Sequence, residues 1–314
     1  MKSGKKRINK IILLSNLIDM ENPQSVIGEV KITISMEIPD FDFRSLNRVY
    51  FDILRVFRGE FPGYRKCNTD YHDLKHTTDT FLSMARLIHG YLVNEEQLSE
   101  EHINLGLISA LMHDTGYIQT SEDSSGTGAK YTREHISRSI IFMENYFTNN
   151  NFSKDDFKFC KNCISCTGIN INFDETGFSS HQEEVIGKML GTSDLLSQMS
   201  ARNYLEKLLF LYYEFREGNI LGYESELDLL NKTIAFYNLT KERFARDFEN
   251  LNKYMLYHFK ERWDIDKDLY NEGIEKNIEY LKYILDKHKK DYQNHLRRSN
   301  ISEKLQQKRL NLKV

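Results

Sequence analysis

The sequence predicts a mainly α-helical protein with a small N-terminal β element. Three observations support this fold class. Apolar residues recur with a period near 3.6 over most of the chain, and one segment near the N-terminus alternates with a period of two. Only 3 of the 314 residues are proline, which disfavours sandwich folds with many turns. The 40% of hydrophobic residues are enough for a sizeable core.

Six segments carry the helical pattern, with apolar residues three or four positions apart. The segment 103–114 is apolar nearly all round, as a central buried helix would be, and we expect it to end near Gly116. The segments 122–130 and 168–181 are predicted loops. The predicted helices cover residues 78–92, 103–114, 134–147, 202–217, 241–260 and 268–288.

Residues 29–38 alternate between apolar and polar side chains and predict a half-buried strand. A single strand needs a partner, which Ile11–Leu14 or the same strand of a second subunit would supply. An unpaired strand therefore leaves room for a homodimer. These patterns divide the chain into an N-terminal appendage (1–44), a helical domain (45–290) and a charged C-terminal tail (291–314).

Charge and cysteine content narrow the class of protein. The 43 Lys and Arg residues nearly balance the 46 Asp and Glu residues, so no basic surface for a nucleic acid polymer is expected. Four cysteines do not make a disulfide framework in a chain of this length, which indicates a reducing compartment. No stretch approaches the length of a membrane span, and no signal peptide is recognisable. We therefore expect a cytoplasmic protein that acts without a membrane.

Three cysteines form a Cys-x-x-Cys-x-x-Cys run at Cys160, Cys163 and Cys166. A zinc or iron–sulfur site there would need a fourth ligand, and Cys67 is the remaining cysteine. The three positions also lie along one stripe of a helix, so we favour small buried side chains over a metal cluster.

Histidines and acids occur at three places that would supply metal ligands. His72 and His76 are four residues apart and share a face of a helix. His113 and Asp114 end an apolar helix, where the carboxylate opposes the helix dipole and needs a cation or a donor. Asp194 lies in a short polar step. Such ligands suit Zn, Mn or Fe, and a bridging carboxylate suits a second, harder ion. From the residues alone, ordinary core or surface histidines remain an equal alternative.

Several motifs resemble known phosphohydrolases. Tyr71–Thr77 (YHDLKHT) resembles the Tyr-His-Asn-x-x-His-Ala signature of class I cyclic nucleotide phosphodiesterases. Leu111–Gly116 (LMHDTG) is similar to the His-Asp step of the HD metal-dependent phosphohydrolase superfamily. Asp194 resembles the phosphodiesterase Ala-Asp-Leu step, and Tyr212–Asn219 resembles the Glu-Glu-Phe-Phe-x-Gln-Gly-Asp stretch that follows it. Order and spacing agree over residues 45–285, which implies an HD/phosphodiesterase-type helical bundle.

The resemblance implies two divalent metal ions and assigns their ligands. His76, His113, Asp114 and Asp194 would hold the first ion, which would be Zn, Mn or Fe. Asp114 would bridge to a second ion, Mg or Mn, bound otherwise by water. His72 would be the general acid, and Asp194 would also orient or deprotonate the attacking water. The implied activity is hydrolysis of a phosphoester, foremost a cyclic nucleotide phosphodiester, by a metal-activated water.

The chain also departs from the phosphodiesterase pattern. Gly116 and Tyr117 replace its second Asp and second His. His135 aligns with the second of two paired histidines and would contact the substrate side of the site or add a ligand. The purine-fixing Gln has no counterpart, so Phe236 would stack on a base without selecting it. Tyr71, from the signature, is the other expected substrate contact.

These departures leave the substrate open. The alternatives are an HD nucleotidase acting on mono- or triphosphates, and a weakly active regulatory domain that binds metal and nucleotide. Retention of His72 favours an enzyme, because a pure binding domain needs no acid. Loss of the second Asp and His favours the regulatory domain.

Overall fold

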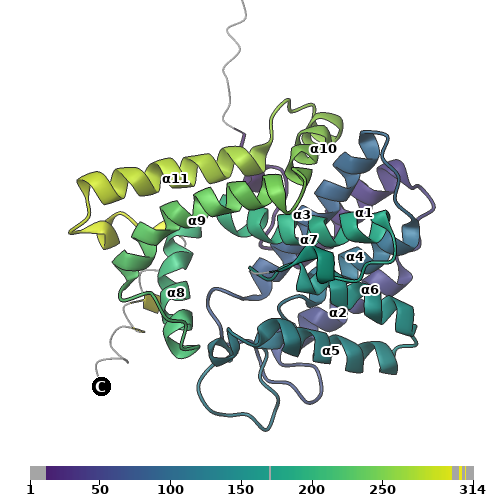
Figure 1. Ribbon diagram of the computed structural model, residues 1–314, viewed down its shortest axis with the longest axis horizontal. Coiled ribbons are helices and arrows are strands. Elements are labelled where there is room, and N and C mark those ends of the chain that lie inside the picture. The colour runs from purple at the N-terminus through teal and green to yellow at the C-terminus, as the bar shows by residue number, and fades with distance from the viewer. Residues whose placement is uncertain (1–11, 170, 299–303, 306–307, 309–314) are drawn as a thin grey trace, which may run out of the picture.

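The computed structural model describes residues 12–169, 171–298, 304–305 and 308 (Figure 1). These residues form eleven α-helices and no strand, with one isolated antiparallel bridge between Tyr64 and Thr120. The mainly α-helical class is thereby confirmed, whereas the HD type of bundle stays a prediction. Within the described residues, none of the helices combines the length and apolar character needed to cross a bilayer. The helices are α1 (Pro23–Glu37), α2 (Arg44–Arg58), α3 (Leu74–Val93), α4 (Glu100–Met112), α5 (His135–Asn149), α6 (Lys154–Ser165), α7 (His181–Ser200), α8 (Tyr204–Glu217), α9 (Glu226–Arg246), α10 (Tyr254–Trp263) and α11 (Leu269–Lys287).

The predicted strand at 29–38 is wrong, because residues 29–37 belong to helix α1. Asn22 caps this helix by accepting the backbone N–H of Gln24 at 2.9 Å. Ile32 and Met36, which produced the alternating pattern, are 50% and 38% exposed on the outer face. The residues that α1 buries recur with helical spacing: Val26, Ile27, Glu29, Val30, Thr33 and Ile34.

The correction removes the predicted N-terminal β element from the described residues. Of the proposed partner strand, Ile11 lies outside the described residues, and Leu14 begins a short 3-10 helix, η1 (Leu14–Asn16). The described residues contain no unpaired strand that could join two subunits, so the homodimer stays a prediction. Helix α1 instead packs against α3.

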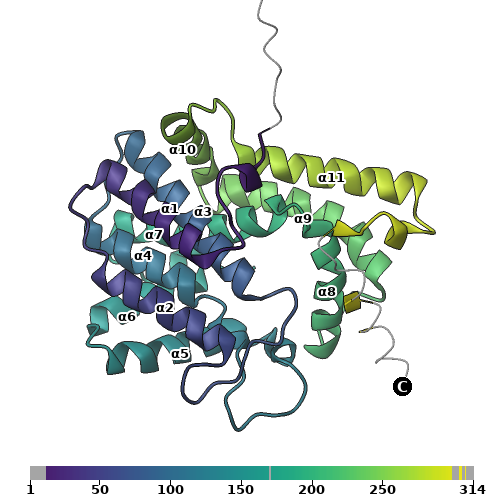
Figure 2. The ribbon, with the colours of Figure 1, turned by 180° about the vertical axis from the view of Figure 1, so that it is seen from behind.

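Helix α3 lies at the centre of the larger group of helices. It packs against α1, α4, α7 and α10, and every residue from His76 to Tyr91 is buried. Figure 2 shows α1 and α2 on the outer side of this group. Near the end of α3, Gly90 lets α10 approach closely, because a Cβ there would lie 1.9 Å from the carbonyl oxygen of Tyr254.

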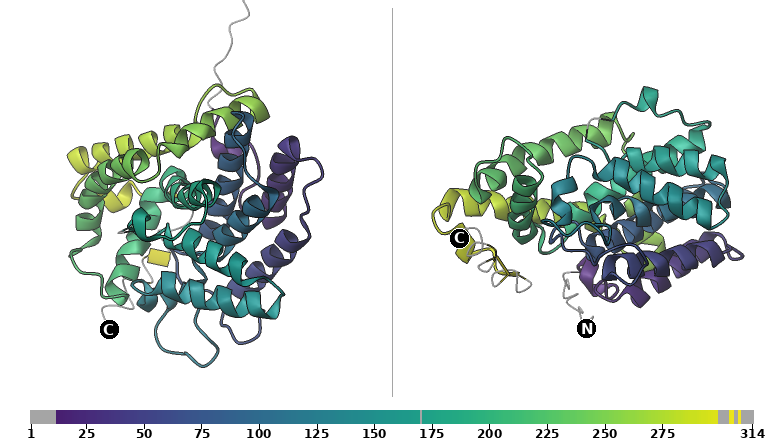
Figure 3. Two further views of the ribbon diagram at one scale, coloured as in Figure 1. Left: turned by 45° about the vertical axis from the view of Figure 1, so that its right-hand side comes forward. Right: turned by 90° about the horizontal axis from the view of Figure 1, so that it is seen from below.

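A second group of helices, α8, α9 and α11, lies beside the first (Figure 3). Helix α11 packs against α7 and α9, and α8 packs against α9. The described part of the predicted tail 291–314 contacts the fold, since Leu296 and Leu305 are buried and Lys308 Nζ donates to Asp70 Oδ2 at 2.7 Å. The predicted domain boundaries themselves stay predictions.

Five of the six predicted helices correspond to α3, α4, α5, α8 and α11. The predicted helix at 241–260 is wrong as a single element: α9 ends at Arg246 and α10 begins at Tyr254. Between them, Glu249 and Asn250 have φ of 51° and 56°, a left-handed conformation that interrupts a helix. Helix α4 also ends at Met112 rather than near Gly116, which lies in the 3-10 helix η2 (Thr115–Tyr117).

The three cysteines of the Cys-x-x-Cys-x-x-Cys run are all buried. Cys160 and Cys163 lie on the inner face of α6 and Cys166 follows its end. Burial raises the pKa of the Cys160 thiol to about 12. In this environment the three side chains pack as small apolar groups.

Candidate metal centre

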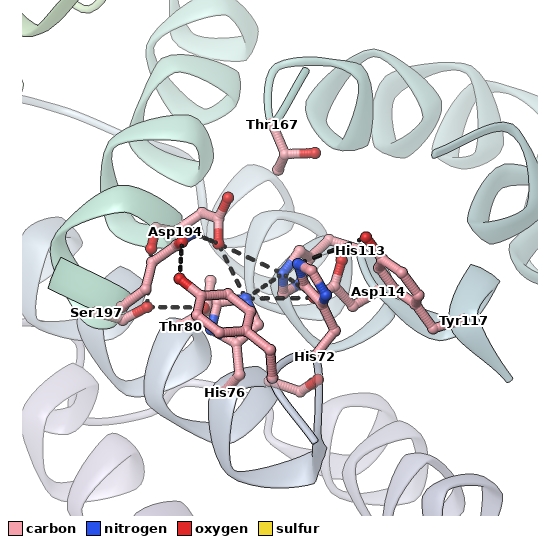
Figure 4. Close-up of polar contacts among 12 residues, drawn as sticks. His72, His76, Thr80, His113, Asp114, Tyr117, Thr167, Asp194 and Ser197 are labelled. Atoms are coloured by element: carbon pink, nitrogen blue, oxygen red, sulfur yellow. Dashed lines mark hydrogen bonds and ion pairs between the residues drawn. The ribbon is translucent and has the colours of Figure 1, made fainter. Parts of the chain in front are cut away.

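Four side chains from three helices meet at one point (Figure 4). His76 lies in the first turn of α3, His113 and Asp114 follow the end of α4, and Asp194 lies within α7. Nε2 of His76 is 3.3 Å from Nε2 of His113, 3.2 Å from Oδ2 of Asp114 and 3.1 Å from Oδ1 of Asp194. Nε2 of His113 lies 3.4 and 3.7 Å from the same two oxygens. All four residues assigned to the first ion are therefore together.

The start of α3 places His76. Asp73 caps the helix and accepts the backbone N–H of His76 at 2.8 Å. Lys207 from α8 donates to the same carboxylate oxygen of Asp73 at 3.0 Å. The cap thus determines where α3 begins, and His76 follows in its first turn, facing α4 and α7.

A tight turn after α4 places His113 and Asp114. Nδ1 of His113 lies 2.8 Å from the carbonyl oxygen of Ala110, to which it donates, so Nε2 is left as an acceptor facing the cluster. Ser139 of α5 donates to the carbonyl of His113 at 2.6 Å and accepts the N–H of Gly116 at 2.8 Å. A Cβ on Gly116 would lie 1.9 Å from the carbonyl oxygen of His135, so glycine is required for α5 to pack here.

The four groups shift one another's protonation. Burial by itself lowers the pKa of His76, but Asp114 and Asp194 outweigh it and raise this pKa to about 10. They also raise the pKa of His113 against its burial. Burial favours the neutral form of both acids, yet the imidazoles hold the pKa of Asp114 well below its usual range and lower that of Asp194. Two buried carboxylates here thus require positive charge between them.

The donor set fits a divalent metal ion. Oδ2 of Asp114 is buried and forms no hydrogen bond with any described residue, and it faces the ring nitrogens of His76 and His113 at 3.2 and 3.4 Å. Nitrogen and oxygen atoms bound to one ion at about 2.0–2.2 Å lie roughly 3 to 3.5 Å apart, close to the spacing here. One donor atom each from His76, His113 and Asp114 lie within 4.8 Å of one another. Two imidazoles with two carboxylates suit Zn, Mn or Fe.

His72, the predicted general acid, is held by a carboxylate. Its Nδ1 lies 2.7 Å from Oε2 of Glu214 on α8. The other oxygen of Glu214 accepts the backbone N–H groups of Asp70 and Tyr71 at 2.8 and 2.7 Å. The carboxylate therefore accepts a hydrogen bond from Nδ1–H and orients the ring, while 14% of the His72 side chain stays exposed.

The ring of Tyr117 stacks between two imidazoles. Its centroid lies 4.2 Å from that of His72 at an interplanar angle of 9°, and 4.8 Å from that of His135 at 21°. Tyr117 Oη is 3.4 Å from Nε2 of His72. Among the described residues, no other hydrogen bond reaches Nε2 of His72.

This stack also bears on the predicted second ion. Tyr117 stands where the phosphodiesterase pattern has a histidine, and 1% of it is exposed. A stacked phenol ring does not replace an imidazole ligand. Of the four clustered residues, Asp114 alone is assigned to a second ion. The second ion itself stays a prediction.

Asp194 is oriented by a chain of hydrogen bonds. Tyr71 Oη donates to Oε1 of Gln198 at 2.8 Å, and Nε2 of Gln198 donates to Oδ1 of Asp194 at 2.9 Å. Tyr71 is 4% exposed. It therefore supports a predicted ligand, and its substrate contact stays a prediction. Nearby, Thr80 and Ser197 share a hydrogen bond of 2.9 Å (Figure 4).

The other two predicted substrate contacts differ in position. His135 is the first residue of α5. Its Nδ1 donates a hydrogen bond of 2.7 Å to the carbonyl oxygen of Thr132, and its ring centroid lies 6.3 Å from that of His72. Burial lowers the pKa of His135. Phe236 is half-buried on α9, and within the described part of the chain no hydrogen bond or ring contact joins it to the four ligands. His135 therefore lies at the site, beside His72 and Tyr117. Phe236 does not contact the four ligands.

Two residues of the site were not assigned a role from the sequence. Glu214 lies in the stretch Tyr212–Asn219, which carries part of the resemblance, and this was the available signal. Gln198 follows Asp194 by four residues on one helix, a spacing that places both side chains on one face.

Comparison with known families matches part of the chain. Residues 121–257 match the Npun_R2479-like family. This stretch contains His135, Asp194 and Glu214 but begins after His113. No curated protein matches the chain.

Proposed function

We propose that this protein is a metal-dependent phosphohydrolase, with a cyclic nucleotide phosphodiester as the favoured substrate. One observation carries the proposal: a buried set of two imidazoles and two carboxylates lies beside a partly exposed imidazole that is itself held by a carboxylate. The first group suits a cation, and the second suits a proton donor. Hydrolysis of a phosphoester needs both.

His76, His113, Asp114 and Asp194 would hold the ion. When bound, a divalent ion supplies a water of lowered pKa and neutralises charge on phosphate oxygens. Gln198 fixes Oδ1 of Asp194 toward the cluster, which leaves Oδ2 to orient the attacking water or accept its proton.

His72 would protonate the leaving oxygen. Nδ1–H of His72 donates its hydrogen bond to Glu214. The proton that passes to the leaving oxygen is therefore the one on Nε2 of the imidazolium. Stacking on Tyr117 holds the ring plane, and among the described residues Nε2 has a hydrogen bond with the Tyr117 hydroxyl alone. Because the His72 side chain is partly exposed, it can regain a proton from solvent.

A regulatory metal- and nucleotide-binding domain is the second candidate. The stacked ring of Tyr117 favours it, because this residue replaces a histidine of the phosphodiesterase pattern with a side chain unsuited to bind a second ion. An HD nucleotidase would share the four ligands and differ in preferring monoesters or triphosphates.

Metal analysis followed by activity assays tests the proposal. Purified protein is assayed with Mn²⁺ on an aryl phosphodiester and an aryl phosphomonoester, and then on a panel of cyclic and linear nucleotides. We expect the wild type to hydrolyse the diester. His72→Ala should keep its metal and turn over about 10²- to 10⁴-fold more slowly, and Asp114→Ala should lose both metal and turnover.

The outcomes separate the candidates. Preference for the monoester or for triphosphates would indicate the nucleotidase. Metal and nucleotide binding without hydrolysis of either ester would indicate the regulatory domain. Equal turnover of wild type and His72→Ala would refute the role of His72 as acid.

A further inference from the structure

A second group of metal-ligand side chains lies outside the buried centre, where α11 ends. His288 is the residue after α11, and Asp291 and His295 flank the 3-10 helix η6 (Tyr292–Asn294). This is the yellow end of α11 in Figure 1. Two of the three residues lie in the segment 291–314, which the sequence predicts to be a charged tail.

The three side chains face one another. His288 Nδ1 lies 3.7 Å from Oδ1 of Asp291, and His295 Nε2 lies 3.4 Å from Oδ2 of the same residue. The two imidazole centroids are 3.8 Å apart, and one donor atom from each of the three residues lies within 4.8 Å of the others. Side-chain exposures of 27%, 50% and 28% leave the group open to solvent.

Both contacts with Asp291 are long, and the one made by His295 is a hydrogen bond of 3.4 Å. Both nitrogen–oxygen distances exceed the usual 2.7–3.2 Å for N–H···O, roughly speaking, and they fall in the range spanned by the four ligands of the buried centre. One long hydrogen bond does not by itself account for two imidazoles gathered on one carboxylate. An ion between the three donors would account for it.

Tyr283 supports this arrangement from the last turns of α11. Its Oη lies 3.0 Å from Nε2 of His288, which occupies the ring nitrogen that faces away from Asp291. A hydrogen bond on the distal nitrogen is the usual way in which a ligand histidine is oriented. It leaves Nδ1 as the atom facing Asp291.

We propose that His288, Asp291 and His295 form a surface site for a divalent transition metal ion such as Zn²⁺, with water in the remaining positions. The site is independent of the proposed hydrolase activity. Lys289 and Lys290 lie between its ligands in the chain, and their charge opposes a cation. We therefore expect weaker binding here than at the buried centre.

Zinc titration calorimetry on the full chain tests the site, with Zn²⁺ alone as the probe. His113→Ala weakens the buried centre, and we expect one zinc equivalent to remain in that variant. Adding His295→Ala should weaken this equivalent at least about tenfold, whereas the matched control His181→Ala, an exposed histidine at the start of α7, should leave it unchanged.

The same substitution in the wild-type background guards against a misfolded His113→Ala variant. There, His295→Ala should remove one weak zinc equivalent while circular dichroism and the tight equivalent stay unchanged. The proposal is overturned if His295→Ala and His181→Ala titrate alike, or if no weak equivalent exists. Because the measurement is zinc stoichiometry, neither result bears on phosphoester hydrolysis.

Discussion

Helix α3 contributes one histidine to each of two buried histidine pairs, one near each of its ends. Near its start, Nε2 of His76 lies 3.3 Å from Nε2 of His113. Near its end, Nδ1 of His89 lies 3.3 Å from Nδ1 of His258 on α10. The two pairs have the same nitrogen–nitrogen distance and each has one histidine in α3, but their surroundings carry opposite charge.

Two carboxylates face the first pair, and guanidinium groups lie near the second. Arg86 is fully buried, and among the described residues no carboxylate pairs with it. Burial, with Arg262 nearby, lowers the pKa of His89 to about 4, and burial with Arg86 holds that of His258 well below its usual range. The closest acid is Glu37, 3.9 Å from Nε2 of His89. Facing imidazoles therefore suit a cation only where acids surround them.

Replacing one histidine of each pair should give the largest difference. His113→Ala removes one of four ligands and should weaken metal binding by about 100-fold or more. His258→Ala should leave the metal in place and lower the free energy of unfolding by about 2 kcal/mol, because it opens a buried space. Metal analysis and urea denaturation of both variants check this. Equal metal loss in the two would break the comparison.

His72 is a third imidazole, and it contacts one carboxylate, Glu214. We expect that carboxylate to make His72 a proton donor. Glu214→Gln keeps the shape but removes the charge that favours the imidazolium. We expect turnover to fall about 10- to 100-fold with metal content unchanged. Steady-state rates and metal analysis of the two proteins measure this. Turnover within twofold of the wild type would show that the carboxylate does not act through His72.

Lowering the pH should destabilise the fold through the second histidine pair, His89 and His258. The folded-state pKa of His89, about 4, lies below the usual value near 6.5, so the unfolded chain binds the extra proton first. Stability from this group is present above pH 6.5 and is lost as pH falls toward 4, by about 2 kcal/mol between pH 7 and pH 5.

Urea denaturation at both pH values measures this loss. The variant His89→Gln should lose about 2 kcal/mol less than the wild type over the same interval. Its own stability at pH 7 cancels in that difference. An equal pH dependence of the two proteins would contradict the assignment of a neutral His89.

The smallest effect on turnover is expected at Tyr117, where the imidazole of His72 stacks on an uncharged ring. Tyr117→Phe keeps the stack on His72 and removes the hydroxyl, so turnover should change less than about threefold, whereas Tyr117→Ala should lower it further. Steady-state kinetics of the two variants decide this. A loss above tenfold in Tyr117→Phe would mean that the hydroxyl takes part in proton transfer.

The helices were predictable wherever the sequence pattern is local. The spacing of apolar residues located α3, α4, α5, α8 and α11, because a helix buries one face whatever it packs against. The same reasoning failed at α1, where every second residue is apolar from Val30 to Ile38 and the helical spacing shows only when Val26 and Ile27 are included. Packing against α3 decides which of these apolar residues are buried, and that contact is not local.

For the candidate site, the sequence by itself determined which side chains are available: His72, His76, the His113–Asp114 step and Asp194. The tertiary structure decided the rest. It brought donors from three helices within 3.1–3.7 Å, set Glu214 against His72 across 142 residues of chain, and surrounded the second histidine pair with guanidinium groups. Charge acts through space, so the order of residues along the chain names the groups but does not reveal which charges each one will face.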